Sequence, residues 1–291
     1  AGSMFSVRGV SSFCQQRLLQ PAGARAMGGR AAKATCGLEV EQFACLNDNY
    51  GYLVHDTLSG LTAAIDTPEV KPYMEVLARR GWKLSHILNT HHHSDHAGGN
   101  LELKSLTGCT IVGPANEKDK IPGIDLALGG GDVFEMGAAK ALVLDVGGHT
   151  KGHIAFHFAQ HQMAFVGDSL FAMGCGRMFE GTYEQMQASM ERFNTLPDET
   201  LIYCAHEYTL SNAKFAVSVE PSNSALQERS AEVHDMRLRG EWTVPSTMGR
   251  ERLTNPFLRY DLPHIRKALG VSASAGKVEA FAAVRKAKDT F

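Results

Sequence analysis

The chain has 291 residues, 44% of them hydrophobic, which is enough to bury the core of one large domain or two smaller ones. Its formal net charge of −2 excludes the strongly basic balance of a general nucleic-acid binder. No apolar run reaches the length of about 18 residues that a membrane span needs, so we expect no transmembrane helix. The six cysteines are scattered without a C-x-x-C pair, which is typical of a reduced intracellular protein.

The N-terminal segment 1–37 differs from the rest of the chain. Residues 1–3 precede Met4 as an expression scar would. From Met4 to Leu38 there is no aspartate or glutamate, while four arginines and a lysine are spaced among serine, alanine and glycine. Such leaders are typical of organelle transit peptides, so we expect a mitochondrial protein, with the plastid as an alternative. If the segment is merely a disordered tail, the protein would be cytoplasmic.

Residues 38–210 mix many strands with intervening helices. Alternating or short apolar runs predict strands at 38–43, 50–56, 61–67, 84–90, 109–113, 139–148, 153–168 (two strands forming a hairpin) and 201–209. A Ser-Gly pair supplies the turn of another hairpin, between the second and third of these runs. Helical spacing covers 68–80 and ends at Gly81, and Asn100 is placed to cap a helix that runs through Leu106.

The C-terminal part of the sequence has a different texture. Residues 211–239 predict helix with an interruption near Pro221, and a polar, proline-containing stretch follows at 239–257. Two further segments, 262–270 and 277–291, have helical spacing. We therefore expect a smaller, mostly helical C-terminal domain.

The strongest chemical signal is the stretch LNTHHHSDHAGGN, residues 88–100. His91, His93, Asp95 and His96 form an H-x-H-x-D-H pattern at the end of a predicted strand. Imidazole and carboxylate together suit zinc, iron or manganese. Because side chains alternate along an extended segment, His91 and His93 point the same way. A tight loop after them can turn Asp95 and His96 toward a second centre.

One short segment cannot complete two metal coordination spheres, so further ligands must come from elsewhere in the chain. His149, Asp168 and His206 recur in one local context, in which a small residue follows an apolar strand and a ligand-type residue comes next. Loops at the ends of strands in a rigid sheet commonly build sites. The repeated context predicts that these three residues join the H-x-H-x-D-H residues.

The remaining histidines are weighed against a purely structural role. A lone histidine on a strand is more often structural than a ligand, and this interpretation applies to His55, His86, His157, His161, His234 and His264. His92 lies between two candidate ligands and is expected to face away from them. His153 follows His149 by four residues and stays open as an alternative ligand.

H-x-H-x-D-H, followed by His149, Asp168 and His206, resembles the metallo-β-lactamase superfamily, whose fold is a four-layer αβ/βα sandwich with a binuclear site at one edge. The stretches GHTKGH, GDSLF, GCGRMFEGT, YCAHEYTLSNAKFA, VPSTMGRERLTNPFLR and VRKAKDTF resemble glyoxalase II, or hydroxyacylglutathione hydrolase, in that family's order. The resemblance covers about residues 39–291 and is nearest to plant-type organellar members. It implies an α+β fold with a catalytic domain at 38–210 and a helical substrate-binding domain at 211–291.

The resemblance also implies a role for each candidate ligand. One divalent metal would be held by His91, His93 and His149, a second by Asp95, His96 and His206, and both would be bridged by Asp168. We expect two ions per chain, zinc first, with iron or manganese as alternatives. A hydroxide between them, beside Asp95 and Asp168, would attack the thioester of S-D-lactoylglutathione, releasing D-lactate and glutathione in the last step of methylglyoxal detoxification. Asn47, Asp48 and Asn49 resemble a family turn that supports the site.

Five residues are implied on the substrate side. Arg285 and Lys288, three apart on one predicted helix face, match positions that contact the glycine carboxylate of glutathione. Arg177 stands where lysine is common, which keeps the charge but changes its geometry. Tyr208 matches a tyrosine that hydrogen-bonds the ligand backbone. Phe179 stands where some members have tyrosine, so one phenol contact is missing.

Three other functions are alternatives to thioester hydrolysis. A persulfide dioxygenase of the same superfamily would use one iron, held here by His91, His149 and Asp168; the full C-terminal segment and the second ligand set argue against it. A non-catalytic relative that binds glutathione conjugates is the second rival. A nuclease is disfavoured because no inserted domain or basic strip is present. We expect a monomer whose only partner is a small glutathione thioester, with no nucleic acid and no membrane.

Overall fold

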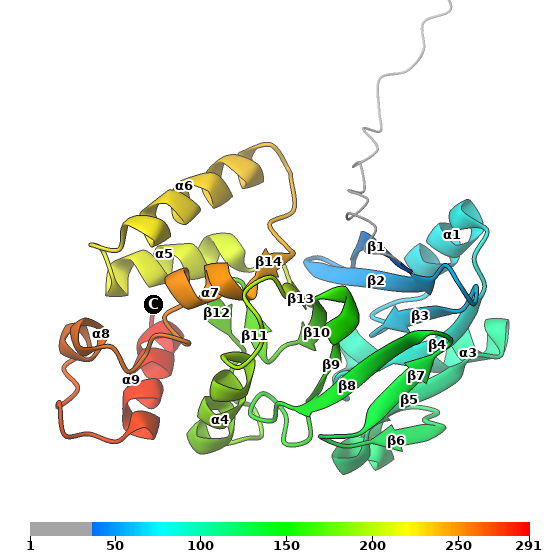
Figure 1. Ribbon diagram of the computed structural model, residues 1–291, viewed down its shortest axis with the longest axis horizontal. Coiled ribbons are helices and arrows are strands. Elements are labelled where there is room, and N and C mark those ends of the chain that lie inside the picture. Colours follow the sequence, from blue (N-terminus) through cyan, green and yellow to red (C-terminus); the bar gives the residue numbers. More distant parts are fainter. Residues whose placement is uncertain (1–36) are drawn as a thin grey trace, which may run out of the picture.

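The computed structural model describes residues 37–291, so nearly all of the expected leader at 1–37, with Cys14 and Cys36, lies outside the described residues. The described chain forms two six-stranded sheets that pack face to face, with helices outside them (Figure 1). The α+β class predicted from the sequence is confirmed.

The first sheet has the strand order β1-β2-β3-β4-β5-β6. Its strands are β1 (Leu38–Cys45), β2 (Asn49–Asp56), β3 (Thr62–Ile65), β4 (Leu84–Leu88), β5 (Thr110–Pro114) and β6 (Leu126–Leu128). The first three strands are joined by antiparallel hairpins, whereas β3 to β6 run parallel. Parallel neighbours need crossover connections, which α1 (Lys71–Arg80) and α3 (Asn100–Thr107) supply on either side of β4.

The second sheet has the strand order β14-β13-β10-β9-β8-β7. Its strands are β7 (Val133–Met136), β8 (Ala139–Asp145), β9 (Ile154–Phe158), β10 (Met163–Gly167), β13 (Leu201–Cys204) and β14 (Ser246–Thr247). All neighbours are antiparallel except β10 and β13, whose crossover contains α4 (Tyr183–Phe193). A small hairpin, β11 (Leu170–Phe171) with β12 (Gly174–Cys175), stands beside this sheet.

The layers follow from which strand faces are buried. Every residue of β9 and β10 is buried, so both faces of the second sheet are covered there. On the first sheet, α1 packs Tyr73 and Val76 against Leu53 and Ile87 of the strands. The main core lies between the two sheets, and α4 adds its buried methionines to it.

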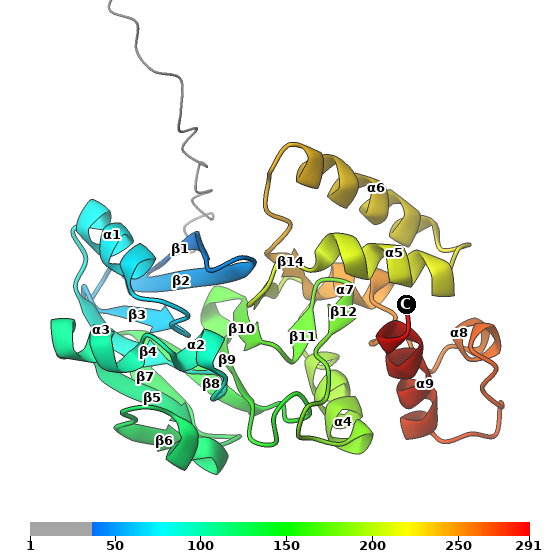
Figure 2. The same ribbon diagram turned by 180° about the vertical axis from the view of Figure 1, so that it is seen from behind.

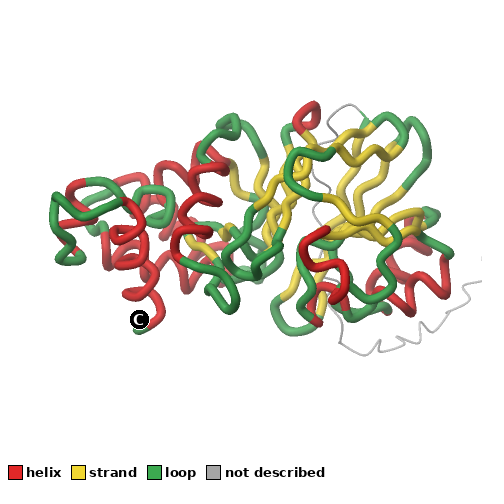
Figure 3. Tube along the Cα trace, turned by 90° about the horizontal axis from the view of Figure 1, so that it is seen from below, coloured by secondary structure: helices red, strands yellow, loops and turns green. Residues whose placement is uncertain are grey.

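The C-terminal helices gather on one side of the strands (Figures 2 and 3). They are α5 (Thr209–Val219), α6 (Ser224–Leu238), α7 (Met248–Thr254), α8 (Pro263–Ala268) and α9 (Lys277–Asp289). The predicted interruption near Pro221 separates α5 from α6, and α7 lies within the polar, proline-containing stretch at 239–257, for which no helix is predicted. Because α9 packs on α4 and β14 joins the second sheet, the helical part is tied to the strands, and the predicted boundary at 210/211 stays a prediction.

Two predicted helix ends have different outcomes. Gly81 ends α1 in the left-handed conformation, with φ of 67°, as expected of a C-terminal glycine. The prediction that Asn100 caps α3 is wrong, because Gly99 occupies that position and Asn100 is the first helical residue. Its carboxamide instead accepts a hydrogen bond from Thr67 and donates one to Asn89, which fixes the loop before the helix.

The described helices and four of the six cysteines can be compared with what the sequence leads us to expect. Among residues 37–291, no helix combines the length and apolar content needed to cross a membrane. Cys45, Cys109, Cys175 and Cys204 are buried and free. Burial raises the pKa of the Cys175 thiol to about 11, which keeps it protonated at neutral pH.

Candidate metal centre

The seven candidate ligands follow four strands that end at the same edge of the sandwich. The H-x-H-x-D-H residues come after β4, in the loop that continues into the short helix α2 (Ser94–Ala97). His149 lies between β8 and β9, Asp168 directly follows β10, and His206 comes two residues after β13. The structure brings all seven together, with ligands from both sheets.

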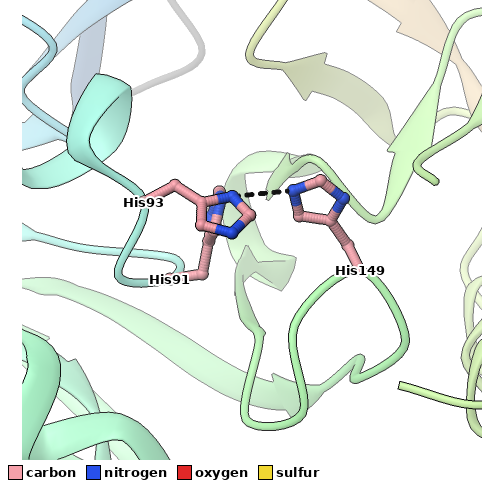
Figure 4. Close-up of side chains that lie close together, drawn as sticks. All are labelled: His91, His93 and His149. Atoms are coloured by element: carbon pink, nitrogen blue, oxygen red, sulfur yellow. Dashed lines mark hydrogen bonds between the residues drawn. The ribbon is translucent and has the colours of Figure 1, made fainter. Parts of the chain in front are cut away.

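The first cluster consists of His91, His93 and His149. The Nε2 atoms of His91 and His149 each lie 3.1 Å from Nδ1 of His93. Figure 4 shows a nitrogen of His149 facing one of His93, with His91 beside them, although His149 comes from a different loop than the other two. Three imidazole nitrogens in this arrangement supply three of the four ligands of a tetrahedral metal site.

The second cluster consists of Asp95, His96 and His206. Oδ2 of Asp95 lies 3.6 Å from Nε2 of His96 and 3.5 Å from Nε2 of His206. The two histidines are buried, whereas the Asp95 side chain is about two-fifths exposed. Two imidazoles and a carboxylate again form a ligand set suited to zinc, iron or manganese.

Asp168 stands between the two clusters. Its Oδ1 lies 3.4 Å from Nε2 of His96 and 3.4 Å from Nε2 of His206, while its Oδ2 lies 3.4 Å from Nε2 of His149. One carboxylate thus turns an oxygen toward each cluster. Asp168 can therefore contribute one ligand atom to each of two neighbouring cations.

Hydrogen bonds on the far side of three rings fix which nitrogen faces the site. Nδ1 of His149 donates to the Arg177 carbonyl oxygen at 2.8 Å. Nδ1 of His206 lies 2.8 Å from an Asp48 carboxylate oxygen, and Nδ1 of His96 lies 2.9 Å from an Asp66 one. With its proton at Nδ1, each ring presents the Nε2 lone pair to the centre, as a metal ligand must.

Asp66 is a supporting residue that sequence reasoning missed. Its carboxylate accepts hydrogen bonds from the backbone N–H of Thr90 at 2.7 Å and from the Thr90 hydroxyl at 2.8 Å. The Thr90 oxygen is then free to accept from Nδ1 of His91, 3.1 Å away. Asp66 adopts φ of 52°, a left-handed conformation that costs a non-glycine residue free energy and is common at functional sites. The signal was present, because Asp66 follows an apolar strand as Asp168 does.

The predicted supporting turn at 47–49 lies beside the second cluster. Asp48 accepts the hydrogen bond from His206, as described above, and the Asn49 carboxamide donates to the Asp95 backbone oxygen at 3.1 Å. These contacts orient a ligand on each of two loops. Asp48 and Asn49 therefore carry the support that the resemblance implied for this turn.

Two buried polar atoms at the centre have no hydrogen-bond partner among the described residues, Nε2 of His96 and Oδ1 of Asp168. Orphaned buried polar atoms are costly, and a bound cation would satisfy both. Burial, reinforced by neighbouring histidines, lowers the pKa of His91 well below its usual value and keeps the ring neutral. Burial also opposes ionisation of Asp168, but His96 and His206 outweigh it and hold the pKa of this carboxyl far below its usual range. The donor set therefore fits divalent metals.

The structure separates the open candidate His153 from the two clusters. Its Nε2 accepts the backbone N–H of Asp168 at 3.1 Å, and its ring stacks on His91 with centroids 4.6 Å apart. His153 thus supports two candidate ligands from behind. His92 faces away from the first cluster toward Glu117, as expected.

Two exposed aromatic rings flank the centre. Phe179 is 64% exposed and lies over the first cluster, with its centroid 5.2 Å from that of His149. Tyr208 stacks on His206 of the second cluster at 4.8 Å. A cavity of about 410 Å³, lined in part by Arg177 and Phe179, opens beside the first ring.

Two of the three predicted cations of the substrate side, Arg177 and Arg285, meet at Asp289, whereas Nζ of Lys288 donates to the carbonyl and hydroxyl oxygens of Ser211 at 3.2 Å. Arg285 is buried and donates to an Asp289 carboxylate oxygen at 2.8 Å and to the Cys175 carbonyl oxygen at 2.9 Å. Nε of Arg177 lies 3.8 Å from the same Asp289 oxygen. Burial lowers the pKa of Lys288, and the nearby charges of Arg285 and Arg177 lower it further. Three cations and one carboxylate leave a net positive charge here.

Comparison with protein families agrees with this geometry. Residues 47–206 match the model of the metallo-beta-lactamase superfamily, and residues 207–291 match the model named hydroxyacylglutathione hydrolase C-terminus. The fold and the two clusters thus define a member of the metallo-β-lactamase superfamily.

Curated relatives narrow the assignment. Hydroxyacylglutathione hydrolase of Hyphomonas neptunium is 55% identical over 254 residues, covering 87% of this chain and 98% of the relative. The protein of the same name from Methylococcus capsulatus is 54% identical, covering 87% and 99%. The chain belongs to the hydroxyacylglutathione hydrolase family, also called glyoxalase II, and the resemblance noted in the sequence is confirmed.

Solved structures support the fold. ETHE1 from Myxococcus xanthus matches with a TM-score of 0.60 at 24% identity, covering 85% of this chain and 96% of that one. A metallo-beta-lactamase from Staphylococcus aureus matches with a TM-score of 0.59 at 22% identity, covering 87% and 72%. At these identities the likeness concerns the fold alone, and it confirms the predicted metallo-β-lactamase sandwich.

Proposed function

We propose that this protein hydrolyses the thioester of S-D-lactoylglutathione and related 2-hydroxyacylglutathiones to a 2-hydroxy acid and glutathione, the last step of methylglyoxal detoxification. The observation that carries the proposal is Asp168, which turns one oxygen toward each ligand cluster in a chain whose curated relatives are hydroxyacylglutathione hydrolases over their whole length.

The ligand roles are part of this proposal. The first cluster, with His91, His93 and His149, holds one divalent ion, and the second, with Asp95, His96 and His206, holds another. Asp168 contributes to both. The mixture of imidazole and carboxylate donors favours zinc, and iron or manganese also suits it. Two such cations would supply Lewis acidity and lower the pKa of a water molecule toward neutrality.

The chain's own residues place the substrate at this centre. Arg177, Arg285 and Lys288 form a cationic group that attracts the carboxylates of glutathione, and Phe179 and Tyr208 confine the thioester between two rings. Asp95 and Asp168 are the only carboxylates among the seven ligands. Their negatively charged oxygens can accept a hydrogen bond from a nucleophilic water and so orient it. The leaving thiolate has a conjugate thiol with a pKa of about 8.5, so no dedicated general acid is needed.

Thioester hydrolysis with metal counting tests the proposal. Purified protein is supplied with S-D-lactoylglutathione, loss of thioester absorbance is followed, and metals are counted in the same sample. Rapid turnover with about two metals per chain supports a binuclear hydrolase. Two bound metals without turnover would sink it in favour of a glutathione-conjugate binder. One iron and oxygen uptake with glutathione persulfide would instead identify a dioxygenase.

We further propose that residues 4–38 direct the protein to mitochondria and that it acts as a monomer. The acid-free, arginine-containing composition of this segment supports the first point. A fluorescent reporter fused to residues 4–38 should enter mitochondria, and entry into plastids or retention in the cytosol would contradict this. Light scattering on the purified chain should give the 31.6 kDa mass of one copy.

A further inference from the structure

Glu117 is a buried carboxylate outside the two ligand clusters, in the 3₁₀ turn η1 (Ala115–Lys120), and it is only 4% exposed. Its Oε2 accepts from both the ring Nδ1 of His92 at 2.8 Å and the backbone N–H of His92 at 3.2 Å. Its Oε1 accepts the backbone N–H of Gly152 at 2.8 Å. One side chain thus binds two separate loops at three points.

Those two loops carry the whole first cluster. His92 lies between His91 and His93, and Gly152 lies three residues after His149. The approach is close, because a Cβ added at Gly152 would come within 2.7 Å of Cγ of Glu117. Glu117 therefore packs tightly between the two loops and adds to the direct hydrogen bond from the Ile154 backbone N–H to the Thr90 carbonyl oxygen at 2.9 Å.

His92 extends this connection to a third segment. Its Nε2 lies 3.3 Å from a carboxylate oxygen of Glu180, which also accepts from Lys120 at 2.9 Å. The backbone N–H groups of Phe179 and Glu180 in turn donate to the carbonyl oxygen of His149, at 3.1 and 3.3 Å. The loop that carries Phe179 beside the centre is thus held against the same network.

His92, Glu117 and Glu180 lie close enough together to hold a cation themselves. Their carboxylate oxygens, however, already have donors. Glu117 accepts from the backbone N–H groups of His92 and Gly152, and Glu180 accepts from Lys120. Such internal satisfaction favours a connecting role over an additional metal site.

We propose that Glu117 is a positioning residue that holds the two loops in register so that His91, His93 and His149 converge on the first metal, and that His92 links this arrangement to the loop of Phe179. The inference rests on the metal centre of the proposed function but not on the identity of the substrate. It predicts that loss of Glu117 weakens one metal site selectively.

Glu117→Gln is the test variant because it keeps the shape and removes one acceptor. A carboxamide turned to accept from Gly152 presents its NH₂ group to the backbone N–H of His92, which cannot accept. In the opposite orientation the carboxamide oxygen accepts from His92, but the NH₂ group then faces the backbone N–H of Gly152, and that hydrogen bond is lost. Glu220→Gln is the matched control, because Glu220 is also 4% exposed and accepts from Arg259 in the helical part of the chain.

The measurement is metal retention and the cobalt(II) absorption spectrum during titration with a chelator, with melting temperature recorded alongside. Glu117→Gln should lower the affinity of one of the two metals by about 10- to 100-fold and alter the cobalt bands, while the other metal is held as in the wild type. Glu220→Gln should lower the melting temperature and leave both metal affinities and the spectrum unchanged.

Several results would overturn the inference. They are wild-type metal affinities in Glu117→Gln, equal losses in the two variants, or a wild-type chain that holds fewer than two metals. A third metal that disappears in Glu117→Gln would overturn it too, by making the cluster a cation site. Because the readout is metal affinity, a wild-type chain that holds two metals but leaves the thioester intact contradicts only the proposed function.

Discussion

At the scale of single residues, Asp168 is the point where the two ligand clusters depend on one another. Each of its oxygens faces a different cluster, and replacing one of them with an NH₂ group puts a donor where a ligand is needed. Asp168→Asn should reduce metal content below two per chain and lower kcat by at least about 100-fold. Metal analysis together with steady-state kinetics checks this. Two tightly held metals in the variant would argue against a shared carboxylate.

Phe179 is where a single hydroxyl should change substrate affinity. Its ring is 64% exposed beside the first cluster, so a phenol oxygen placed there can meet the ligand without disturbing packing. A net hydrogen bond of about 0.5–1.5 kcal/mol corresponds to a decrease in KM of roughly 2- to 10-fold. Phe179→Tyr should therefore lower KM for S-D-lactoylglutathione with kcat little changed. Tyr208→Phe, on the opposite flank, is the reciprocal variant and should raise KM; an unchanged KM in both would discount these hydroxyls.

His96 makes metal binding dependent on pH. Burial disfavours its charged form, but Asp168, Asp66 and Asp95 outweigh burial and raise the pKa of His96 in the metal-free protein to about 9. A metal must then displace a proton, so the apparent affinity of the second site should rise at least about tenfold per pH unit below pH 9, because the pKa of His206 is raised as well, and level off above it. Competition with a chromophoric chelator below, near and above pH 9 measures this. A flat profile would contradict it.

The same shift affects the stability of the metal-free protein. The folded-state pKa of His96 lies above the ordinary value of 6.5, so the protonated ring stabilises the fold. That contribution is complete below pH 6.5 and is lost as pH rises through about 9. Added metal should abolish the dependence, because the metal-bound ring stays neutral throughout this pH range, with its one proton on Nδ1 facing Asp66.

At the scale of secondary-structure elements, α4 begins with a capping box that sequence reasoning overlooked. The Thr182 hydroxyl accepts from the Gln185 backbone, and the Gln185 side chain accepts from the Thr182 backbone. Thr182→Ala should lower the free energy of unfolding by about 1 kcal/mol. Because Thr182 lines the cavity beside Phe179, KM should rise as well if α4 frays. Denaturant unfolding and kinetics measure the two effects, and unchanged stability would contradict the role of the cap.

The sequence predicts best those elements whose ends are marked by turn residues. The hairpin of β2 and β3 and the buried strand β4 were predicted because apolar pattern and turn residues agree there. By contrast, α4 has the T-x-x-Q start and the apolar spacing of Met186, Met190 and Phe193, but it lies between two loops of the site and was not recognised. The two-residue strands β11 and β12 have too few residues to show any period.

The residues of the candidate site also fall into two groups, those that the sequence predicts and those that it does not. Its seven proposed ligands were found because ligand-type residues repeat one context at strand ends. The supporting residues Asp66, Thr90 and Glu117 were not, because their roles depend on hydrogen bonds between segments far apart in the sequence. Glu117 in particular reaches a loop 35 residues away, which no local pattern reveals.

At the scale of the whole molecule, the metal centre joins the two sheets. Four of the proposed ligands follow β4 of the first sheet, whereas His149, Asp168 and His206 follow strands of the second. Bound cations would therefore connect the sheets along one edge of the sandwich, where Oδ1 of Asp168 and Nε2 of His96 otherwise have no hydrogen-bond partner among the described residues.

Removing the metals should accordingly lower the stability of the entire sandwich. A ligand present at about 1,000 times its Kd stabilises the native state by about 4 kcal/mol, which for a chain of this size corresponds to a melting temperature shift on the order of 10 °C. Calorimetry before and after dialysis against a chelator should show this decrease, and added zinc should reverse it. Hydrogen exchange should then accelerate at the ends of β4, β10 and β13 more than within α6, which contributes no proposed ligand. An unchanged melting temperature, or a loss confined to the C-terminal helices, would show that the two sheets do not depend on the metals for their contact.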